Sequence, residues 1–285
     1  ATEFAKKATR SDIKSIFGEF KNLVHGCDTL ELCCQPEAWN GHANPLAFLP
    51  SQESHNHGYA LDLTGGFDAA LNEGNGARKR KKYRWQTNKL KDVGGGKPLV
   101  AQTPDDCERI LEAAFTQMAV RFDRSGIWNT FDDEGVKTFL TAAALRSLVQ
   151  KEPELRLFAL EIEGEIRATF AAGIHAGQMS GCFLSIADDD WRSVSPGEML
   201  IHDVVKHCTE AGLHTFDLGR GQERYKISWC PTTIAMFETV IPLSRRAGGL
   251  AFYERSKLAA KRLVKRNDAT WEFAKKVRSK LYGKL

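Results

Sequence analysis

The sequence predicts an α/β fold with a mixed, mostly antiparallel sheet flanked by helices. The order of elements over residues 98–243 carries this prediction: a strand, two helices, three strands, a helix, a strand, a short helix and a final strand pair. Two tight turns, at 163–165 and 176–177, separate apolar runs and indicate hairpins. Three adjacent antiparallel strands are therefore expected in the middle of the chain.

Each element follows from hydrophobic spacing and from residues that start or stop helices. A good helix start, Thr103-Pro104-Asp105-Asp106, opens one of them, and Pro153 follows the end of the next. The expected helices cover 12–24, 67–91, 103–123, 133–151, 196–212 and 223–229, with two basic helices after 243. The expected strands cover 29–34, 45–50, 58–63, 98–103, 155–163, 165–175, 178–187, 214–218 and a pair within 232–242.

The composition is that of an ordinary soluble protein. With 285 residues, 42% of them apolar and 27% charged, the chain is expected to form one or two domains. It contains no apolar run near the roughly 18 residues that a membrane span needs, and its first residues lack the apolar region of a secretory signal. The seven cysteines show no CxxC spacing, which favours reduced thiols and a cytoplasmic protein.

Basic charge is concentrated in two places. Residues 245–285 hold 13 Lys and Arg against 3 Asp and Glu, and a second cluster, RKRKKYR, occupies 78–84. The cluster suits a solvated helix with an apolar inner side, but also a groove for an anionic acceptor or nucleic acid. The tail helices could dock on the domain, lie on an anionic membrane surface, or bind a carrier protein or tRNA.

The stretch 191–208, WRSVSPGEMLIHDVVKHC, is the richest in chemical signals. Its Ser195-Pro-Gly-Glu198 sequence matches a capping box with proline at the first helical position. A helix start of this kind offers free backbone N–H groups to an anion, and Arg192 stands just before it as a phosphate partner. The alternative is a structural cap beside a solvated arginine.

The order of elements and the 192–197 segment together resemble the GCN5-related N-acetyltransferase (GNAT) family. In that family the corresponding loop, Q/R-x-x-G-x-G/A, wraps the pyrophosphate of acetyl-CoA; here Ser195 stands where the first glycine is expected. The following DxxxGxExYKxxW pattern from Asp217 resembles the GNAT subfamily associated with cellulose and exopolysaccharide biosynthesis, which is related to Fem-type aminoacyltransferases. The resemblance implies a partial N-terminal GNAT-like half (1–97), a complete acyltransferase domain (98–243) and basic C-terminal helices (244–285).

The resemblance also implies the roles of particular residues. Arg192, Ser195, Pro196 and Gly197 would hold the pyrophosphate. Strand 214–218 would diverge from strand 178–187 to admit the pantetheine arm, and Gly219 and Gly221 would give clearance and a sharp turn.

Three residues near these glycines are the candidates for chemistry. Tyr225 would protonate the leaving thiolate, Asp217 would accept the amine proton, and Lys226 would stabilise the oxyanion or bind an anionic acceptor. Asp217 could instead cap its turn, and Lys226 could be an ion-pair partner of Glu223 or Asp217.

The sequence therefore predicts an enzyme that moves an acetyl or other acyl group from acyl-CoA to an amine acceptor, such as an amino sugar or polysaccharide precursor. Alternatives are an aminoacyl-tRNA-dependent transferase and a non-catalytic, membrane-peripheral module. No metal is expected, because the His55-x-His57 pair has no cysteine or carboxylate cluster at ligand spacing. His175 is a second candidate for the general base.

Overall fold

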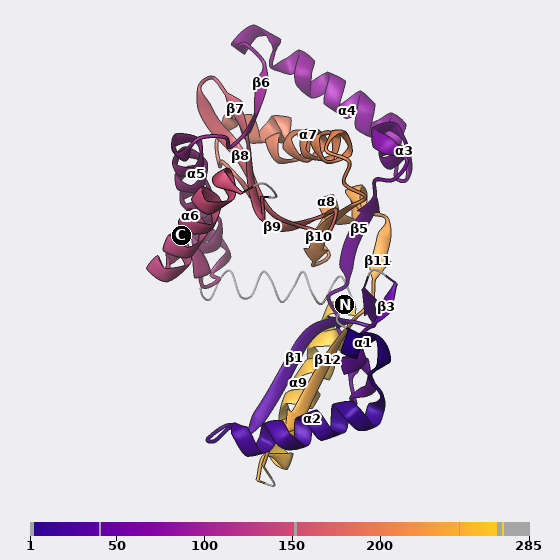
Figure 1. The fold of residues 1–285 in the computed structure, drawn as a ribbon. Coiled ribbons are helices and arrows are strands. Elements are labelled where there is room, and N and C mark those ends of the chain that lie inside the picture. Colours follow the sequence, from indigo (N-terminus) through magenta and orange to yellow (C-terminus); the bar gives the residue numbers. More distant parts are fainter. Residues whose placement is uncertain (1–2, 40, 151–152, 245, 267–269, 271–285) are drawn as a thin grey trace. The chain divides into compact units, whose positions relative to one another are not determined.

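The computed structural model describes residues 3–39, 41–150, 153–244, 246–266 and 270 (Figure 1). These residues divide into two compact units. The first contains the described parts of Ala1–Gly58, Arg220–Gln222 and Thr233–Lys275. The second contains the described parts of Tyr59–Gly219 and Glu223–Thr232. The three-segment division expected from the sequence stays a prediction.

The first unit is built on a three-stranded sheet of order β1 (Thr29–Pro36), β12 (Met236–Pro242) and β4 (Gln52–Glu53). Its other elements are α1 (Glu3–Lys7), α2 (Arg10–Leu23), β2 (Ala38–Trp39), β3 (His42–Ala43), the 3-10 helix η1 (Pro45–Phe48) and α9 (Gly248–Arg266). The second predicted tail helix lies outside the described residues.

One strand prediction in this unit is wrong. Residues 45–48 form η1 instead of a strand, because Asn44 caps the turn through its side chain and Pro45 follows it. The two strands predicted within 232–242 are present as β11 (Thr232–Ile234) and β12, but they do not pair with each other, because β12 is hydrogen-bonded to β1 and β4. That pairing joins segments about 200 residues apart, which no local signal can predict.

The second unit contains the predicted mixed sheet. Its strands have the order β5 (Gly58–Asp62), β10 (Thr215–Arg220), β9 (Gln178–Ile186), β8 (Glu165–His175), β7 (Leu155–Ile162) and β6 (Gly96–Val100). Strands β6 to β9 are antiparallel neighbours, whereas β10 runs parallel to β9. Both predicted hairpins are confirmed.

Alternation along the strands divides the core between the two faces of the sheet. On one face Phe158, Leu160 and Phe170 pack in a cluster with α7 (Pro196–Glu210). On the other, Leu157 and Ala159 pack with α5 (Pro104–Ser125) and α6 (Glu134–Val149). Figure 1 shows these helices on opposite sides of the sheet. The α/β prediction with flanking helices is thus confirmed.

The charged helix expected over 67–91 is two helices, α3 (Gly66–Asn72) and α4 (Gly76–Lys89). Asn75 starts the second one, since its side chain accepts a hydrogen bond from the backbone N–H of Arg78 at 3.1 Å. The inner side of α4 is polar rather than apolar: Lys79 and Gln86 are buried there and Tyr83 is partly buried. After α4 come the short 3-10 helix η2 (Lys91–Val93) and then β6.

Three short helices complete the described part of this unit. They are η3 (Thr130–Asp132), η4 (Asp190–Val194) and α8 (Arg224–Trp229). All seven cysteines are free thiols. Within the described residues, no helix is both long enough and apolar enough to cross a membrane.

Candidate active site

A cavity of about 440 Å³ lies where β9 and β10 diverge, and we call it the strand cleft. Hydrogen-bonded pairing between the two strands covers Thr215 to Asp217 on β10 and stops opposite Ser180. Beyond that point β9 continues to Ile186 paired with β8 but no longer with β10. The side chains that line the cleft include Leu184 and Ile186 of β9, Val120 and Arg121 of α5, and Glu223 and Tyr225 around the start of α8.

A β-bulge marks the same stretch of β9. Ala171 of β8 pairs with Phe183 and Ala172 pairs with Gly181, so Cys182 is the extra residue. A bulge interrupts the ladder and turns backbone groups away from the neighbouring strand. The bulge thus supplies polar backbone groups beside the point of divergence.

Arginines gather at another part of the cleft. Arg121, Arg124 and Arg192 all line it, together with Asp188. Asp188 forms ion pairs with both Arg124 and Arg192. The Arg192 side chain keeps 65% of its surface exposed, so it can exchange this carboxylate for a phosphate with little rearrangement.

The capping box predicted for 195–198 is wrong. Ser195 has left-handed backbone angles, φ 59° and ψ 60°, and its side chain makes no capping hydrogen bond. Glu198 forms an ion pair with Lys82 of α4 instead of reaching back to Ser195. The side-chain amide of Gln86 donates to the carbonyl oxygens of Val194 (2.7 Å) and Ser195 (3.1 Å), and thereby fixes the turn.

The left-handed conformation explains the glycine expected at position 195. Glycine adopts positive φ at no steric cost, whereas a serine there costs roughly 1–2 kcal/mol. The buried Gln86 compensates by holding the carbonyls. Residue 195 thus has a backbone conformation that a glycine would adopt freely.

Packing against Ile186 explains why residue 197 is a glycine. Gly197 is buried together with Pro196, and a Cβ placed on it would lie 2.6 Å from Cδ1 and 3.0 Å from Cγ1 of Ile186. Since Ile186 lines the strand cleft, a larger residue at 197 would push that side chain toward the cleft. The roles of Ser195, Pro196 and Gly197 in binding pyrophosphate stay predictions.

Tyr225 is the one predicted chemical residue that lines the strand cleft. Burial raises the pKa of its phenol, and nearby Glu223 raises it further, against an opposing effect of Arg121. The phenol therefore stays protonated at neutral pH and can donate a proton.

Asp217 and Lys226 are buried beside the cleft rather than in its lining. The Asp217 carboxylate accepts a hydrogen bond from the N–H of Gly219 at 2.6 Å, which is the turn-capping alternative. Burial raises the pKa of Asp217, while that hydrogen bond and Lys226 oppose the rise. Lys226 forms a 3.4 Å ion pair with Glu223, which is also the structural alternative.

The two glycines of the motif have the backbone conformation that the predicted sharp turn needs. Gly219 has φ 68° and Gly221 has φ 115°. His175 ends β8 at the hairpin, the opposite end of β9 from Leu184 and Ile186, and so does not face the cleft. In the described part of the chain, no three His, Cys, Asp or Glu side chains gather as a metal site.

Comparison with known proteins identifies the class of this chain. The acetyltransferase (GNAT) domain family matches residues 77–227, more than half of the chain, so the chain belongs to this family. No curated protein matched the chain.

Several solved structures share the fold. A conserved protein of unknown function from Bacteroides thetaiotaomicron VPI-5482 is 16% identical, with TM-score 0.55 over 81% of this chain and 75% of that one. FemX is 11% identical, with TM-score 0.55 over 82% and 77%. The C-terminal domain of a putative lysylphosphatidylglycerol synthetase from Agrobacterium fabrum is 16% identical, with TM-score 0.50 over 73% and 66%. These matches extend beyond 77–227, in keeping with the predicted two-part organisation. None of them supports the cellulose- or exopolysaccharide-associated type, which stays a prediction.

Sequence reasoning missed Arg121 and Arg124, because both lie on an amphipathic helix that looks structural. Their spacing of three residues places them on one helix face, and this was the available signal. It also missed Gln86, whose contact with the 194–195 turn joins distant parts of the sequence.

Proposed function

We propose that the chain transfers an acyl group from acyl-CoA to an amine, with the strand cleft as the donor site. The observation that carries the proposal is that one cavity holds a protonated phenol, apolar walls and three arginines. The apolar walls suit a pantetheine arm. The side chains of Arg121, Arg124 and Arg192 suit the phosphates of CoA.

In this reaction the amine nitrogen attacks the thioester carbonyl carbon, the carbon–sulfur bond breaks, and the amide forms. Tyr225 gives its proton to the departing thiolate. Backbone N–H groups at the Cys182 bulge stabilise the oxyanion, with Lys226 as a further candidate. Asp217 takes the amine proton, directly or through water; its raised pKa brings it closer to the basicity this needs.

Isothermal titration with acetyl-CoA tests the donor. Saturable binding at micromolar concentration is expected, and a variant with Arg124→Gln and Arg192→Gln should bind about tenfold or more weakly. Absence of binding at millimolar concentration would remove the proposal. A screen of amino sugars and polysaccharide precursors by mass spectrometry would then identify the acceptor.

A second candidate is aminoacyl transfer from aminoacyl-tRNA, favoured by the fold shared with FemX and by the arginine group. It predicts RNA that co-purifies with the protein and an affinity for tRNA that falls steeply with salt. Binding to the surface of an anionic membrane through α9 and the tail, with a cytoplasmic location, also stays a proposal. Flotation with vesicles, with and without residues 247–285, tests it.

A further inference from the structure

A second, smaller cavity lies under α4 and shares no lining residue with the strand cleft. We call it the helix cavity. Its volume is about 90 Å³, and α4, α7 and the end of α8 form its walls. A single water needs about 10–15 Å³ by this measure, so the cavity can hold a tetrahedral oxyanion but not a nucleoside.

Lys79 is the unusual member of its lining. The residue is 9% exposed, and its Nζ has no hydrogen-bond partner among the described residues. The Nζ lies 4.6 Å from the ring centroid of Trp229, which also lines the cavity. A buried ammonium with one aromatic face as its neighbour is costly, unless an anion completes its surroundings.

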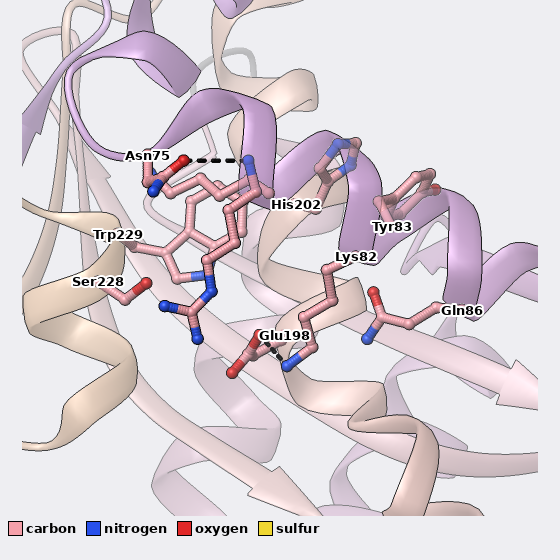
Figure 2. A pocket seen from close by; sticks show the side chains of 10 residues that line it. Asn75, Lys82, Tyr83, Gln86, Glu198, His202, Ser228 and Trp229 are labelled. Carbon is pink, nitrogen blue, oxygen red and sulfur yellow. Dashed lines mark hydrogen bonds and ion pairs between the residues drawn. The ribbon is translucent and has the colours of Figure 1, made fainter.

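The charges around the cavity also favour an anion. Arg78 and Lys82 line it along with Lys79, whereas Glu198 is its one acidic lining residue. Figure 2 shows Glu198 joined by an ion pair to Lys82, so that carboxylate is already neutralised. Of the lining cations, Arg78 and Lys79 remain to balance a bound anion, although the charge of Glu73, which does not line the cavity, also acts on Lys79.

The opposite wall is held rigidly, as a binding site requires. The rings of Tyr83 and His202 stack with centroids 3.7 Å apart, side by side in Figure 2. The Tyr83 hydroxyl donates to Asp203 at 2.6 Å, and burial raises its pKa, so it stays a neutral donor. Gln86 is fixed by the carbonyls of the 194–195 turn.

We propose that the helix cavity binds a phosphate group, and that Lys79 and Arg78 hold it. The ligand is either inorganic phosphate or the phosphate monoester of a larger molecule whose remainder lies outside the cavity. The two cavities share no lining residue, so failure of this proposal would leave the proposal for the strand cleft untouched.

The test is titration of the full chain with inorganic phosphate, at constant ionic strength set with sodium chloride. The wild-type protein is expected to bind saturably, and Lys79→Met to weaken binding about tenfold or more, because a charge-assisted hydrogen bond is lost. Lys81→Met is the matched control: it makes the same change on the same helix, but Lys81 is exposed and does not line the cavity. Equal affinity for the two variants would overturn the proposal, as would the absence of saturable binding.

Folding is checked by thermal melting without phosphate. Lys79→Met is expected to melt no lower than wild type, since it removes a buried charge from which no described residue accepts a hydrogen bond. Arg78→Gln changes an exposed side chain and gives an independent reading if Lys79→Met does not fold. It should also weaken phosphate binding, and unchanged binding in Arg78→Gln would count against the site.

A second arm distinguishes the sources of the phosphate. If it is the 3′-phosphate of the acyl donor, Lys79→Met weakens CoA but leaves dephospho-CoA unchanged, and inorganic phosphate competes with CoA alone. If it belongs to an acceptor or to free phosphate, both forms of CoA bind Lys79→Met as they bind wild type. Either result leaves titration with acetyl-CoA as the separate test of the strand cleft.

Discussion

The strand cleft and the helix cavity are both rich in basic side chains, yet they expose them differently. In the cleft, Arg192 and Arg124 share Asp188 as an ion-pair partner, and Arg192 is largely in solvent. In the helix cavity, Lys79 is buried against an indole ring and no described residue accepts a hydrogen bond from it. Exposed paired charges capture a long ligand weakly and are screened by salt, whereas a buried charge selects a small anion strongly.

The walls differ as well. Leu184 and Ile186 give the cleft an apolar side, and Tyr225 adds a proton donor. The helix cavity has polar and aromatic side chains held by hydrogen bonds, and none of them is a proposed catalytic group. The walls of the strand cleft therefore suit the proposed chemistry, whereas those of the helix cavity suit the anchoring of a ligand.

The largest expected effect that tests this comparison is a change in kcat. Tyr225→Phe is expected to lower kcat for acyl transfer by about 100-fold or more, because general acid catalysis contributes about 10²–10⁴-fold. Thiol release from acetyl-CoA in the presence of an amine measures it. Affinity for acetyl-CoA should change less than twofold, and phosphate binding in the helix cavity not at all. A Tyr225→Phe enzyme with wild-type kcat would show that the proton comes from elsewhere.

The next effect concerns the arginines. Arg124→Gln with Arg192→Gln should weaken acetyl-CoA binding about tenfold or more, because hydrogen bonds between two charged groups are lost. The dependence of affinity on salt should become shallower at the same time. Arg84→Gln, an exposed position on α4, is the control and should bind acetyl-CoA normally. A double variant that matches this control would exclude these arginines as phosphate ligands.

Local signals predicted the parts of the second unit that local contacts build. The hairpins at 163–165 and 176–177 each join strands that are neighbours in sequence, so turn residues and alternation were sufficient. The pairing of β12 with β1 and β4, and the break between α3 and α4, depend on distant partners or on one capping asparagine.

The candidate site was predicted less completely, for a physical reason. Ser195 and Glu198 fit a capping box by spacing, yet Lys82 pairs with Glu198 and Gln86 stabilises a left-handed Ser195. Tertiary partners override a motif that contributes only about 1 kcal/mol. Tyr225 was predicted because the motif around it resembles that of a known family. Arg121 and Arg124 on α5 belong to no such motif, so they were not predicted.

Packing at the start of α7 should couple stability to the cleft. Gly197→Ala is expected to cost about 1–3 kcal/mol of unfolding free energy, since the new Cβ overlaps the Ile186 side chain. It should also weaken acetyl-CoA, because Ile186 is pushed toward the cleft. Gly197→Ala combined with Ile186→Val, which removes the nearest atom, should recover part of both losses in chemical denaturation and titration. Normal stability but weak binding in Gly197→Ala would instead support direct contact between ligand and backbone.

The smallest expected effect is on the pH dependence of stability, and here the two regions should have opposite signs. Burial raises the pKa of Asp217 above its ordinary value, so the folded protein binds more protons than the unfolded chain in the window above pH 3.8. Stability from this group is present below that pH and lost as pH rises. Asp217→Asn should therefore gain relative to wild type from pH 3.8 upward.

Lys79 should behave in the opposite way. Burial lowers its pKa, while Cys230 and Glu73 oppose the change and Arg78 and Lys82 lie nearby on the same helix. The folded protein then binds fewer protons than the unfolded chain just below pH 10.5, and stability from this group rises with pH. The advantage of Lys79→Met over wild type should be largest at low pH and shrink toward pH 10.5. Urea denaturation from pH 5 to pH 10 would measure both variants, and slopes of the same sign would contradict the opposite directions of the two pKa shifts.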